Sequence, residues 1–435
     1  MRKPRFRSDK FSKFMASDTG AQARYAQRLK HRVSIPIDEI EPQSKKMRPA
    51  DCDRFQNAVA EHLTMMKRGT FKGDIALKLD LGTTSPNAPQ AHTIAKNFLD
   101  LLGKRRPGVK WPKRSLLYDD DSQIQALSVS CRHGEDRPRI CVEARPLSSM
   151  LDDLELGAEA VHHEERDDPG AYYTKERDDE WIETFADIIR DEARNRRELG
   201  DEMYEAYFKM TRWSAQQAVL GRSGVDIPVL NWLYERPKAI PTGLNSEMWA
   251  DLLLKSKRRL HVGDLPISEG GSAAFKAGVA AEIARFKQDW DWVLNPLVIA
   301  VALEVVVRPN PNTPVGVLHD LDNIVRDYLL PGIVPAFGTV TDHRWTIDFE
   351  ELNRRDPEMA ARWGPNPTPP RGTKSGVTRY EAWRLPPVPG KAGFVSVALV
   401  ADMDVQGDTM QRLDERIKRW AIERARKEED RRRFR

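Results

Sequence analysis

The sequence predicts an α+β protein in which one unit, of the order strand–helix–strand–helix–strand–strand, occurs twice along the chain. Segments in which apolar and polar residues alternate predict strands, and apolar residues spaced three or four apart predict the helices between them. The same order of elements returns in the second half, which places the two units at 31–148 and 258–404. Two units can share an order of strands and helices by chance. A true repeat is favoured here because acidic and basic residues also occur at matching positions in the two units.

The first unit begins with HRVSIPI, residues 31–37, which alternates like a short strand. A helix is expected in DRFQNAVAEHLTMMKR, because Phe55, Val59 and Leu63 recur at helical spacing. The unit continues with a strand in DIALKLDL, a helix in HTIAKNFLDLL, and strands in YDDDSQIQALSVSC and RPRICVEARPL.

The second unit begins with RLHVGDLPI as a strand and SAAFKAGVAAEIARFKQDW as a helix, in which Phe275, Val279 and Ile283 form the apolar stripe. LVIAVALEVVV then predicts a buried strand, and HDLDNIVRDYLL predicts a second helix. VTDHRWTI places an acid before a strand, and VTRYEAWRLP and GFVSVALVADM close the unit as two strands.

The segment 149–257 separates the units and is expected to be an acidic linker followed by a helical insert. His162, His163 and the acids after them could bind a metal. A solvated linker is favoured, because nothing fixes their geometry and Pro169 and Gly170 follow closely. The following WIETFADIIRDEARNRRELGDEMYEAYFKMTRW is strongly helical in its pattern.

Residues 405–435 are expected to form a charged helix with many opposite charges three and four residues apart. Its apolar face is thin, since it consists of Leu413, Ile417, Trp420 and Ala421. We therefore expect this helix to pack weakly or to bind a partner.

Composition argues against membrane and secreted classes. Hydrophobic residues make up 40% of the 435 residues, enough for a core, and charged residues make up 31%. No apolar run approaches the roughly 18 residues that a membrane helix needs, and the basic start MRKPRFRSDKFSKF has no signal-peptide core. Three cysteines without a C-x-x-C pair argue against a zinc site or a disulfide framework. A cytoplasmic protein is expected.

Positive charge is concentrated in three segments, although the net charge is only +4. They are the tail 1–30, the C-terminal RARKEEDRRRFR, and a loop after residue 103 that contains no acid. Such clusters suit a polyanion such as DNA, whose counterions are released on contact. A solvated surface is the alternative, and it is favoured for each terminus taken alone. The basic residues of the loop are Lys104, Arg105, Arg106, Lys110, Lys113 and Arg114.

Two aspartates, Asp320 and Asp322, stand two residues apart at the start of a predicted helix. A helix N-cap together with Asn323 explains one acid, but two close carboxylates repel and are usually tolerated by binding a divalent cation. Arg326 lies one helical turn further on, and Asp342 opens the next strand about twenty residues later. Hard oxygen ligands of this kind indicate magnesium, with manganese as the alternative.

With these residues the second unit resembles the RusA family of Holliday-junction resolvases. That family carries D-x-D-N-x-x-K at a helix start, followed about twenty residues later by an aspartate that opens a strand. The match comprises Asp320, Asp322, Asn323 and Asp342, and Arg326 stands where the family has lysine. The family's order of strands and helices is also the order predicted for both units, and the resemblance leaves the tails and the insert unexplained.

The resemblance implies a function and an assembly. Asp320, Asp322 and Asp342 would ligate magnesium, and Arg326 would stabilise the transition state while a phosphodiester bond in branched DNA is hydrolysed. RusA-like resolvases act as symmetric homodimers on four-way junctions. Two fused copies would therefore form a pseudo-dimer within one chain, and further self-association stays open.

The first unit matches the family only in part. Asp121 of YDDDSQI stands in the position equivalent to Asp342, and Lys96 stands where the basic residue belongs, but Gln90 and His92 replace the two acids. We expect this copy to be degenerate and poor in metal, with Asp120 and Asp121 as a candidate remnant site. Lys96 and the basic loop would contact DNA phosphates.

Two other hypotheses stay open. The chain could be a non-catalytic DNA-binding or assembly protein derived from a resolvase, in which the acids of the second unit are remnants. It could also be an unrelated metal-dependent nuclease with a D-x-D pair of independent origin, which a structure without paired units would favour.

Overall fold

The computed structural model describes most of the chain, and the rest is left out of the account below. The described residues are 18–85, 87–167, 173–221, 223–235, 245–265, 272–337, 379–401 and 407–433, with 354, 357 and 377. Asp342 and the strand expected around it lie outside them.

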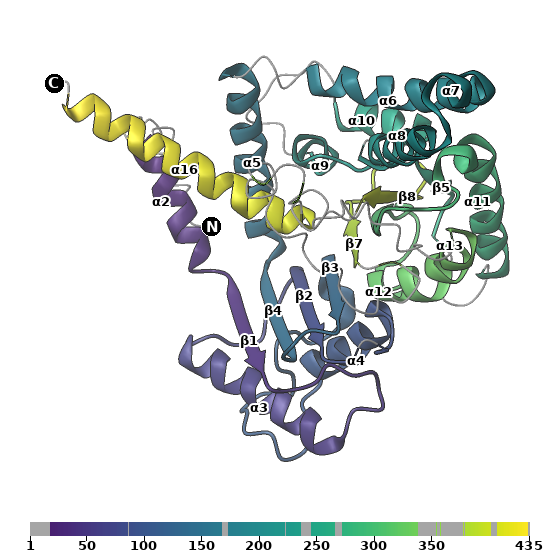
Figure 1. The fold of residues 1–435 in the computed structure, drawn as a ribbon. Coiled ribbons are helices and arrows are strands. Elements are labelled where there is room, and N and C mark those ends of the chain that lie inside the picture. The colour runs from purple at the N-terminus through teal and green to yellow at the C-terminus, as the bar shows by residue number, and fades with distance from the viewer. Residues whose placement is uncertain are drawn as a thin grey trace.

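One mixed open sheet runs through the described part of the chain and contains eight strands (Figure 1). The strands lie in the order β1-β4-β2-β3-β7-β6-β8-β5. With the helices around it, this sheet confirms the expected α+β class. The strands are β1 (Val33–Asp38), β2 (Ile75–Thr83), β3 (Ile124–His133), β4 (Arg139–Pro146), β5 (Leu260–Val262), β6 (Val301–Arg308), β7 (Arg379–Arg384) and β8 (Phe394–Ala401).

The two halves of the sheet have the same connections. In the first half β4 pairs antiparallel with β1 and with β2, and β2 pairs parallel with β3. In the second half β8 pairs antiparallel with β5 and with β6, and β6 pairs parallel with β7. The halves meet where β3 and β7 pair antiparallel, with Ser128 opposite Glu381. From each outer edge to the centre, the order of the strands is therefore first, fourth, second, third.

A large core cluster lies on one face of the sheet and takes side chains from both halves. Phe55, Val59 and Leu63 have no exposed surface, as their spacing predicts. Phe275, Val279 and Ile283 are buried on the equivalent helix of the second half. The elements on this face include α3 (Pro49–Met65), α4 (Ala91–Gly103), α11 (Ser272–Leu294), α12 (Leu321–Asn323), the π-helical turn Ile324–Leu329 and α13 (Leu330–Phe337).

A second core cluster lies on the opposite face. Neighbouring strand residues such as Ala76 and Leu77 belong to different clusters, because successive side chains of a strand point to opposite faces. The second cluster involves α5 (Leu147–Asp167), α9 (Ile227–Leu233), α10 (Ser246–Lys255) and α16 (Thr409–Arg433), and α2 (Asp18–Leu29) packs against α16.

The remaining helices form a layered group that packs against β8 and α11 (Figure 1). They are α6 (Tyr173–Arg190), α7 (Glu192–Leu199) and α8 (Asp201–Gly221). Among the described residues, none of the helices is both long and apolar enough to cross a membrane.

The acidic linker expected around His162 is wrong as far as Asp167, because α5 continues to that residue. Met150, Leu154, Ala158 and Val161 are buried and recur every three or four residues, which is the spacing of a helix face. The acids occupy the positions between them, and their density hid the apolar pattern.

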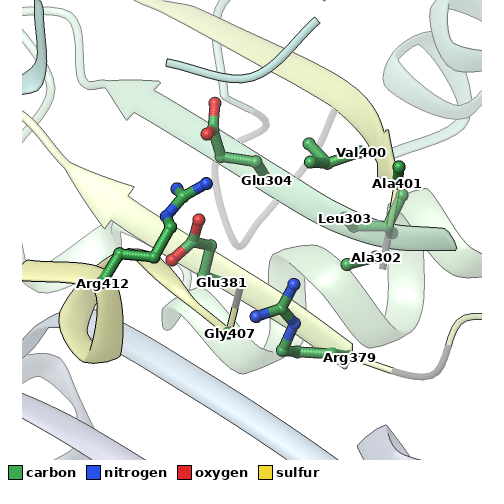
Figure 2. Close-up of a pocket in the computed structure, with 9 residues that line it drawn as sticks. All are labelled: Ala302, Leu303, Glu304, Arg379, Glu381, Val400, Ala401, Gly407 and Arg412. Atoms are coloured by element: carbon green, nitrogen blue, oxygen red, sulfur yellow. The ribbon is translucent and has the colours of Figure 1, made fainter. Parts of the chain in front are cut away.

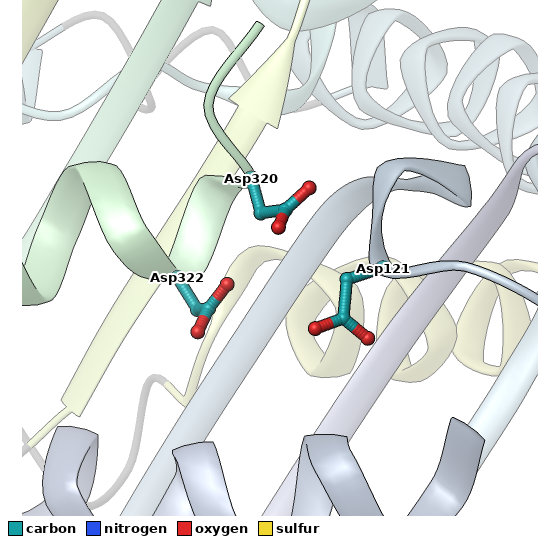
Figure 3. Close-up of side chains that lie close together, drawn as sticks. All are labelled: Asp121, Asp320 and Asp322. Carbon is teal, nitrogen blue, oxygen red and sulfur yellow. The ribbon is translucent and has the colours of Figure 1, made fainter. Parts of the chain in front are cut away.

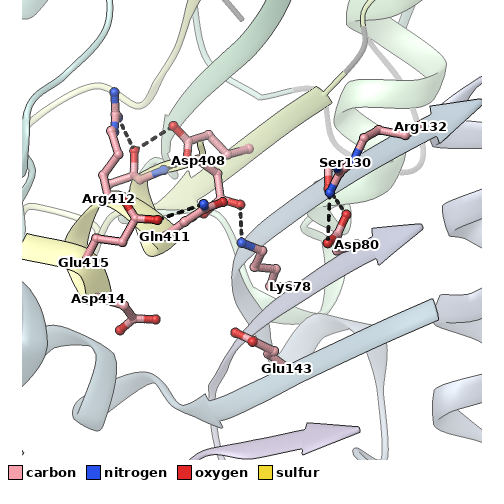
Figure 4. Close-up of polar contacts among 12 residues, drawn as sticks. Lys78, Asp80, Ser130, Arg132, Glu143, Asp408, Gln411, Arg412, Asp414 and Glu415 are labelled. Carbon is pink, nitrogen blue, oxygen red and sulfur yellow. Dashed lines mark hydrogen bonds and ion pairs between the residues drawn. The ribbon is translucent and has the colours of Figure 1, made fainter. Parts of the chain in front are cut away.

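The expectation that the C-terminal helix packs weakly is also wrong. Leu413 and Ile417 have no exposed surface and Trp420 keeps 4%, because the thin apolar face lies in the second core cluster. Polar contacts fasten the start of α16 to the sheet. Lys78 of β2 lies 2.8 Å from a carboxylate oxygen of Asp408, which precedes α16 (Figure 4).

The central strand β7 makes a further contact with the start of α16. The buried Glu381, drawn in Figure 2 beside Arg412, accepts hydrogen bonds from the backbone N–H and the hydroxyl of Thr409, at 2.9 and 2.7 Å. The helix is therefore fixed to both halves of the sheet, through Lys78 in the first half and Glu381 in the second.

The close approach of α5 and α16 leads to the first prediction. A Cβ added to Gly157 would overlap Cδ1 of Leu413 and lie 3.2 Å from Ile227. Gly157→Ala should therefore lower the free energy of unfolding by about 1–3 kcal/mol, as overpacking of a core does. The matched control is Gly221→Ala at the end of α8, where a Cβ meets nothing within 4 Å. Denaturant unfolding compares the two variants, and equal stability would contradict the packing described.

Candidate metal centre

Three aspartates from the two halves of the chain gather at one place. One carboxylate oxygen from each of Asp121, Asp320 and Asp322 lies within 4.8 Å of the others (Figure 3). Asp121 belongs to the first half, whereas Asp320 and Asp322 belong to the second. We call these three residues the acid cluster.

Three consecutive aspartates stand before β3, and only the last of them, Asp121, belongs to the acid cluster. Asp121 begins a short 3-10 turn, and Asp120 caps it by accepting a hydrogen bond of 2.9 Å from the N–H of Ser122. Asp119 is exposed and pairs with Lys72 at 2.7 Å. Asp120 and Asp121, predicted together as a remnant site, thus have different surroundings. Asp120 is hydrogen-bonded to the backbone, and Asp121 lies in the acid cluster.

Asp320 and Asp322 project from the start of α12. Asp320 holds the N-cap position, but its side chain makes no capping hydrogen bond. It accepts one from the amide of Asn323 at 3.3 Å instead. Asp322 is only 5% exposed, and its Oδ2 atom is buried without a hydrogen-bond partner. Its nearest cations, Lys96 and Arg326, lie 3.4 and 3.5 Å from this oxygen, so a metal ion could approach it more closely than either does.

Two cations flank the acid cluster, one from each half. The Nζ atom of Lys96 on α4 lies 3.1 Å from Asp121 and 3.4 Å from Asp322. Arg326 lies 3.5 Å from Asp322. Its guanidinium is held by Asp327, at 2.6 and 2.7 Å, and by Asn323 at 2.6 Å.

Burial and mutual repulsion raise the pKa of two acids of the cluster, Asp320 and Asp322. Burial, followed by the charges of Asp121 and Asp322, raises the pKa of Asp320 to about 6. Burial also raises the pKa of Asp322, although Lys96 acts against it. For Lys96, burial opposes the charged ammonium, but the carboxylates outweigh it and raise its pKa. A divalent cation bound there would offset the repulsion among the three carboxylates.

The acid cluster could hold a metal ion. Its donors are carboxylate oxygens, the hard ligands that magnesium and manganese prefer. The Oδ2 atom of Asp322, which is buried and makes no hydrogen bond, fits this role. The sequence predicts that Asp342 joins Asp320 and Asp322 as a third metal ligand, but Asp342 lies outside the described residues. In the structure the third carboxylate beside the pair is that of Asp121, from the other half.

The equivalent place in the first half lacks acids. Gln90 holds the position before α4, and His92 lies in its first turn. Burial, and then the charge of Arg326, lower the pKa of His92, so the ring is neutral at pH 7. Within the described ranges, no other group of three potential ligands gathers as the acid cluster does.

The basic loop is partly used to hold its own shape. Arg105 donates to the carbonyls of Val109 and Trp111, at 3.2 and 2.9 Å, and Arg106 pairs with Asp53 at 2.6 Å. Arg105 stays exposed despite these hydrogen bonds, and the other exposed cations along the loop are Lys104, Lys110, Lys113 and Arg114. They are the better candidates for contacts with phosphate.

Comparison with known proteins adds no relative to this description. No protein-family model matches the chain, and neither the curated proteins nor the solved structures yield a match. The resemblance to RusA-like resolvases therefore stays a prediction from the residues named above.

The raised pKa of Asp320 leads to the second prediction. A carboxyl group must lose its proton before it can bind a metal, so Mn²⁺ should bind more tightly at pH 7 than at pH 5. The increase in melting temperature caused by Mn²⁺ should therefore grow between these two pH values. In metal-free protein the sign is opposite, because a raised folded pKa means that this group's stabilisation is lost as pH rises through about 6.

Scanning calorimetry with and without Mn²⁺ measures both effects. Asp119→Asn is the control, since Asp119 is exposed and lies outside the acid cluster; the pH dependence should survive in it. A thermal shift of the same size at pH 5 and pH 7 would argue against metal binding by these carboxylates.

Proposed function

We propose that the chain is a magnesium-dependent endodeoxyribonuclease that cuts branched DNA in the manner of RusA-like Holliday-junction resolvases. The observation that carries the proposal is the acid cluster, in which Asp320 and Asp322 of the predicted D-x-D motif approach Asp121. The Asp322 Oδ2 atom is buried and makes no hydrogen bond, which supports a metal ion there in place of the longer ion pairs with Lys96 and Arg326.

The matching connections of the two half-sheets support a pseudo-dimer built from two fused copies of one unit. Each copy would donate complementary parts to the acid cluster. The second copy contributes the D-x-D pair, and the first contributes Asp121 together with Lys96. The second copy has Arg326 where the family has lysine, and Lys96 of the first copy would thus supply a lysine to the site.

The residues of the site divide the chemistry between them. Magnesium held by the acid cluster would supply Lewis acidity at a phosphate oxygen. Lys96 and Arg326 lie beside the same carboxylates and would balance the negative charge that develops on the phosphate. Asn323 contacts both Asp320 and Arg326 and would keep the two in register.

DNA would approach along the side of the site that the basic loop borders. The loop leaves α4 at Gly103, returns through paired residues at Ser115 and then leads to the turn of Asp121. Its exposed cations would hold the duplex arms by their phosphates and leave the choice of substrate to the shape of the junction.

A second candidate function is a DNA-binding or assembly protein without catalysis. The ion pairs of Lys96 with Asp121 and Asp322 favour it, because a lysine can neutralise an acid cluster without any metal. Cleavage measured beside binding separates the two candidates.

The third prediction tests the nuclease. Asp121→Asn and Asp322→Asn should each abolish Mg²⁺-dependent cleavage of a four-way junction, because each removes a negative ligand from a hard-cation site. Junction binding should persist in both variants. Asp120→Asn is the matched control, since Asp120 only caps the turn and asparagine caps equally well. Undiminished cleavage by Asp322→Asn would refute the assignment, and tight binding without cleavage by the natural chain would favour the second candidate.

The fourth prediction follows from the single acid cluster among the described residues. Resolution of a junction requires two symmetric cuts, so one chain with one site should nick one strand and release a nicked product. A supercoiled cruciform plasmid should become open circular rather than linear, with the mass of the protein in solution measured alongside. Linear plasmid produced in one binding event by a proven monomer would contradict the prediction.

A further inference from the structure

The Lys96 ammonium lies beside the acid cluster, where it would compete with a metal ion for the carboxylates. Its Nζ atom lies 3.1 Å from Asp121 Oδ2 and 3.4 Å from Asp322 Oδ2. The lysine side chain is only 16% exposed and that of Asp322 only 6%, so little water screens these charges. The single ammonium charge thus offsets part of the negative charge of two of the three carboxylates in the metal-free chain.

We propose that Lys96 is a displaceable counterion: it holds the acid cluster together without metal, and when a divalent cation binds it leaves Asp121 and Asp322 and keeps only its existing pairing with Asp100. The inference rests on the proposed metal site and concerns its regulation. It makes Asp100, one helical turn further along α4, a positioning residue that retains the lysine.

The geometry makes simultaneous occupancy unfavourable. A magnesium ion lies about 2.0–2.1 Å from its oxygen ligands. The ammonium hydrogen-bonds a ligand oxygen of Asp121, at 3.1 Å, and approaches Asp322 Oδ2. A metal between those two carboxylates would meet a positive charge at short range in a poorly screened site, and the two cations repel.

Asp100 offers the ammonium a second partner that is already in place. Its Oδ1 atom lies 3.1 Å from Lys96 Nζ, and the two residues are four apart on α4. The Asp100 side chain is 42% exposed and that of Asp322 only 6%, so a lysine that kept Asp100 as its single partner would lie nearer to solvent than it does beside Asp322. Lys96 can leave Asp121 and Asp322 by a change of side-chain rotamer and still keep one carboxylate.

Arg326 does not share this freedom. Three hydrogen bonds to Asp327 and Asn323 fix its guanidinium, and it stays 3.5 Å from Asp322. Both cations have a charged partner outside the acid cluster, Asp100 for Lys96 and Asp327 for Arg326, but only Lys96 also hydrogen-bonds a carboxylate of the cluster, that of Asp121. Metal loading and release of the lysine are therefore coupled, and the released ammonium becomes available to an incoming phosphate.

The experiment measures the affinity of the full chain for Mn²⁺ by isothermal titration calorimetry or by electron paramagnetic resonance. Lys96→Met keeps the aliphatic stem and removes the competing charge, so Mn²⁺ should bind more tightly, on the order of ten-fold. Lys45→Met is the matched control. Lys45 also pairs with Asp100, at 3.2 Å, but its side chain is 69% exposed and it does not contact the acid cluster; its loss should leave the affinity unchanged.

A lysine that only scaffolds the carboxylates predicts the reverse result. Its removal would let the acids move apart, and Mn²⁺ would bind more weakly to Lys96→Met. Weaker or unchanged binding therefore overturns the proposal.

A double-mutant cycle tests the second partner. Asp100→Asn removes the partner that the lysine keeps, so Mn²⁺ should bind several-fold more weakly in the presence of Lys96 and without change in the Lys96→Met background. An equal effect of Asp100→Asn in both backgrounds overturns the role of Asp100. Failure of the proposed function looks different: neither the natural chain nor Lys96→Met would bind Mn²⁺, or Asp322→Asn would bind it as well as the natural chain.

Discussion

The antiparallel pairing of β3 with β7 is the constraint on which the rest of the structure depends. It joins two half-sheets of the same topology into one sheet, and it places Ala126 near the start of β3 opposite Trp383 near the end of β7. The turn that carries Asp121 precedes β3, and α12 contacts both strands. The seam between the halves therefore brings the acids together, and a slip by one residue would turn their supporting side chains to the wrong face.

Cations from both halves offset part of the negative charge of the acid cluster. Three carboxylates meet two cations, Lys96 and Arg326, and each half supplies one of these cations. Breaking a buried ion pair by removing one partner commonly costs several kcal/mol, because the other charge stays buried. The half-buried Asp320, with its raised pKa, is the member of the cluster that responds most readily to a change in this balance.

The elements within each half could be predicted from the sequence, but the two strands through which the halves pair could not. Apolar spacing marks residues such as Phe55 and Val305, which are fully buried in the structure. The D-x-D pair is also visible, because Asp320 and Asp322 stand at a helix start. Nothing in the sequence says that β3 pairs with β7, since each could equally be an outer strand of its own half. The sequence alone therefore places Asp121 in a separate remnant site, and it places Lys96 at the basic position of the first unit, as a contact for DNA.

The acid cluster takes residues from both halves of the chain, so a metal ion bound there would also connect the two halves. A cation held between Asp121 on one side and Asp320 and Asp322 on the other would act as a cross-link across the β3–β7 seam. Partial unfolding, in which one half opens while the other stays folded, would have to release that cation first. Supply of the metal would then govern how often the seam opens, and with it how readily proteases reach the interior.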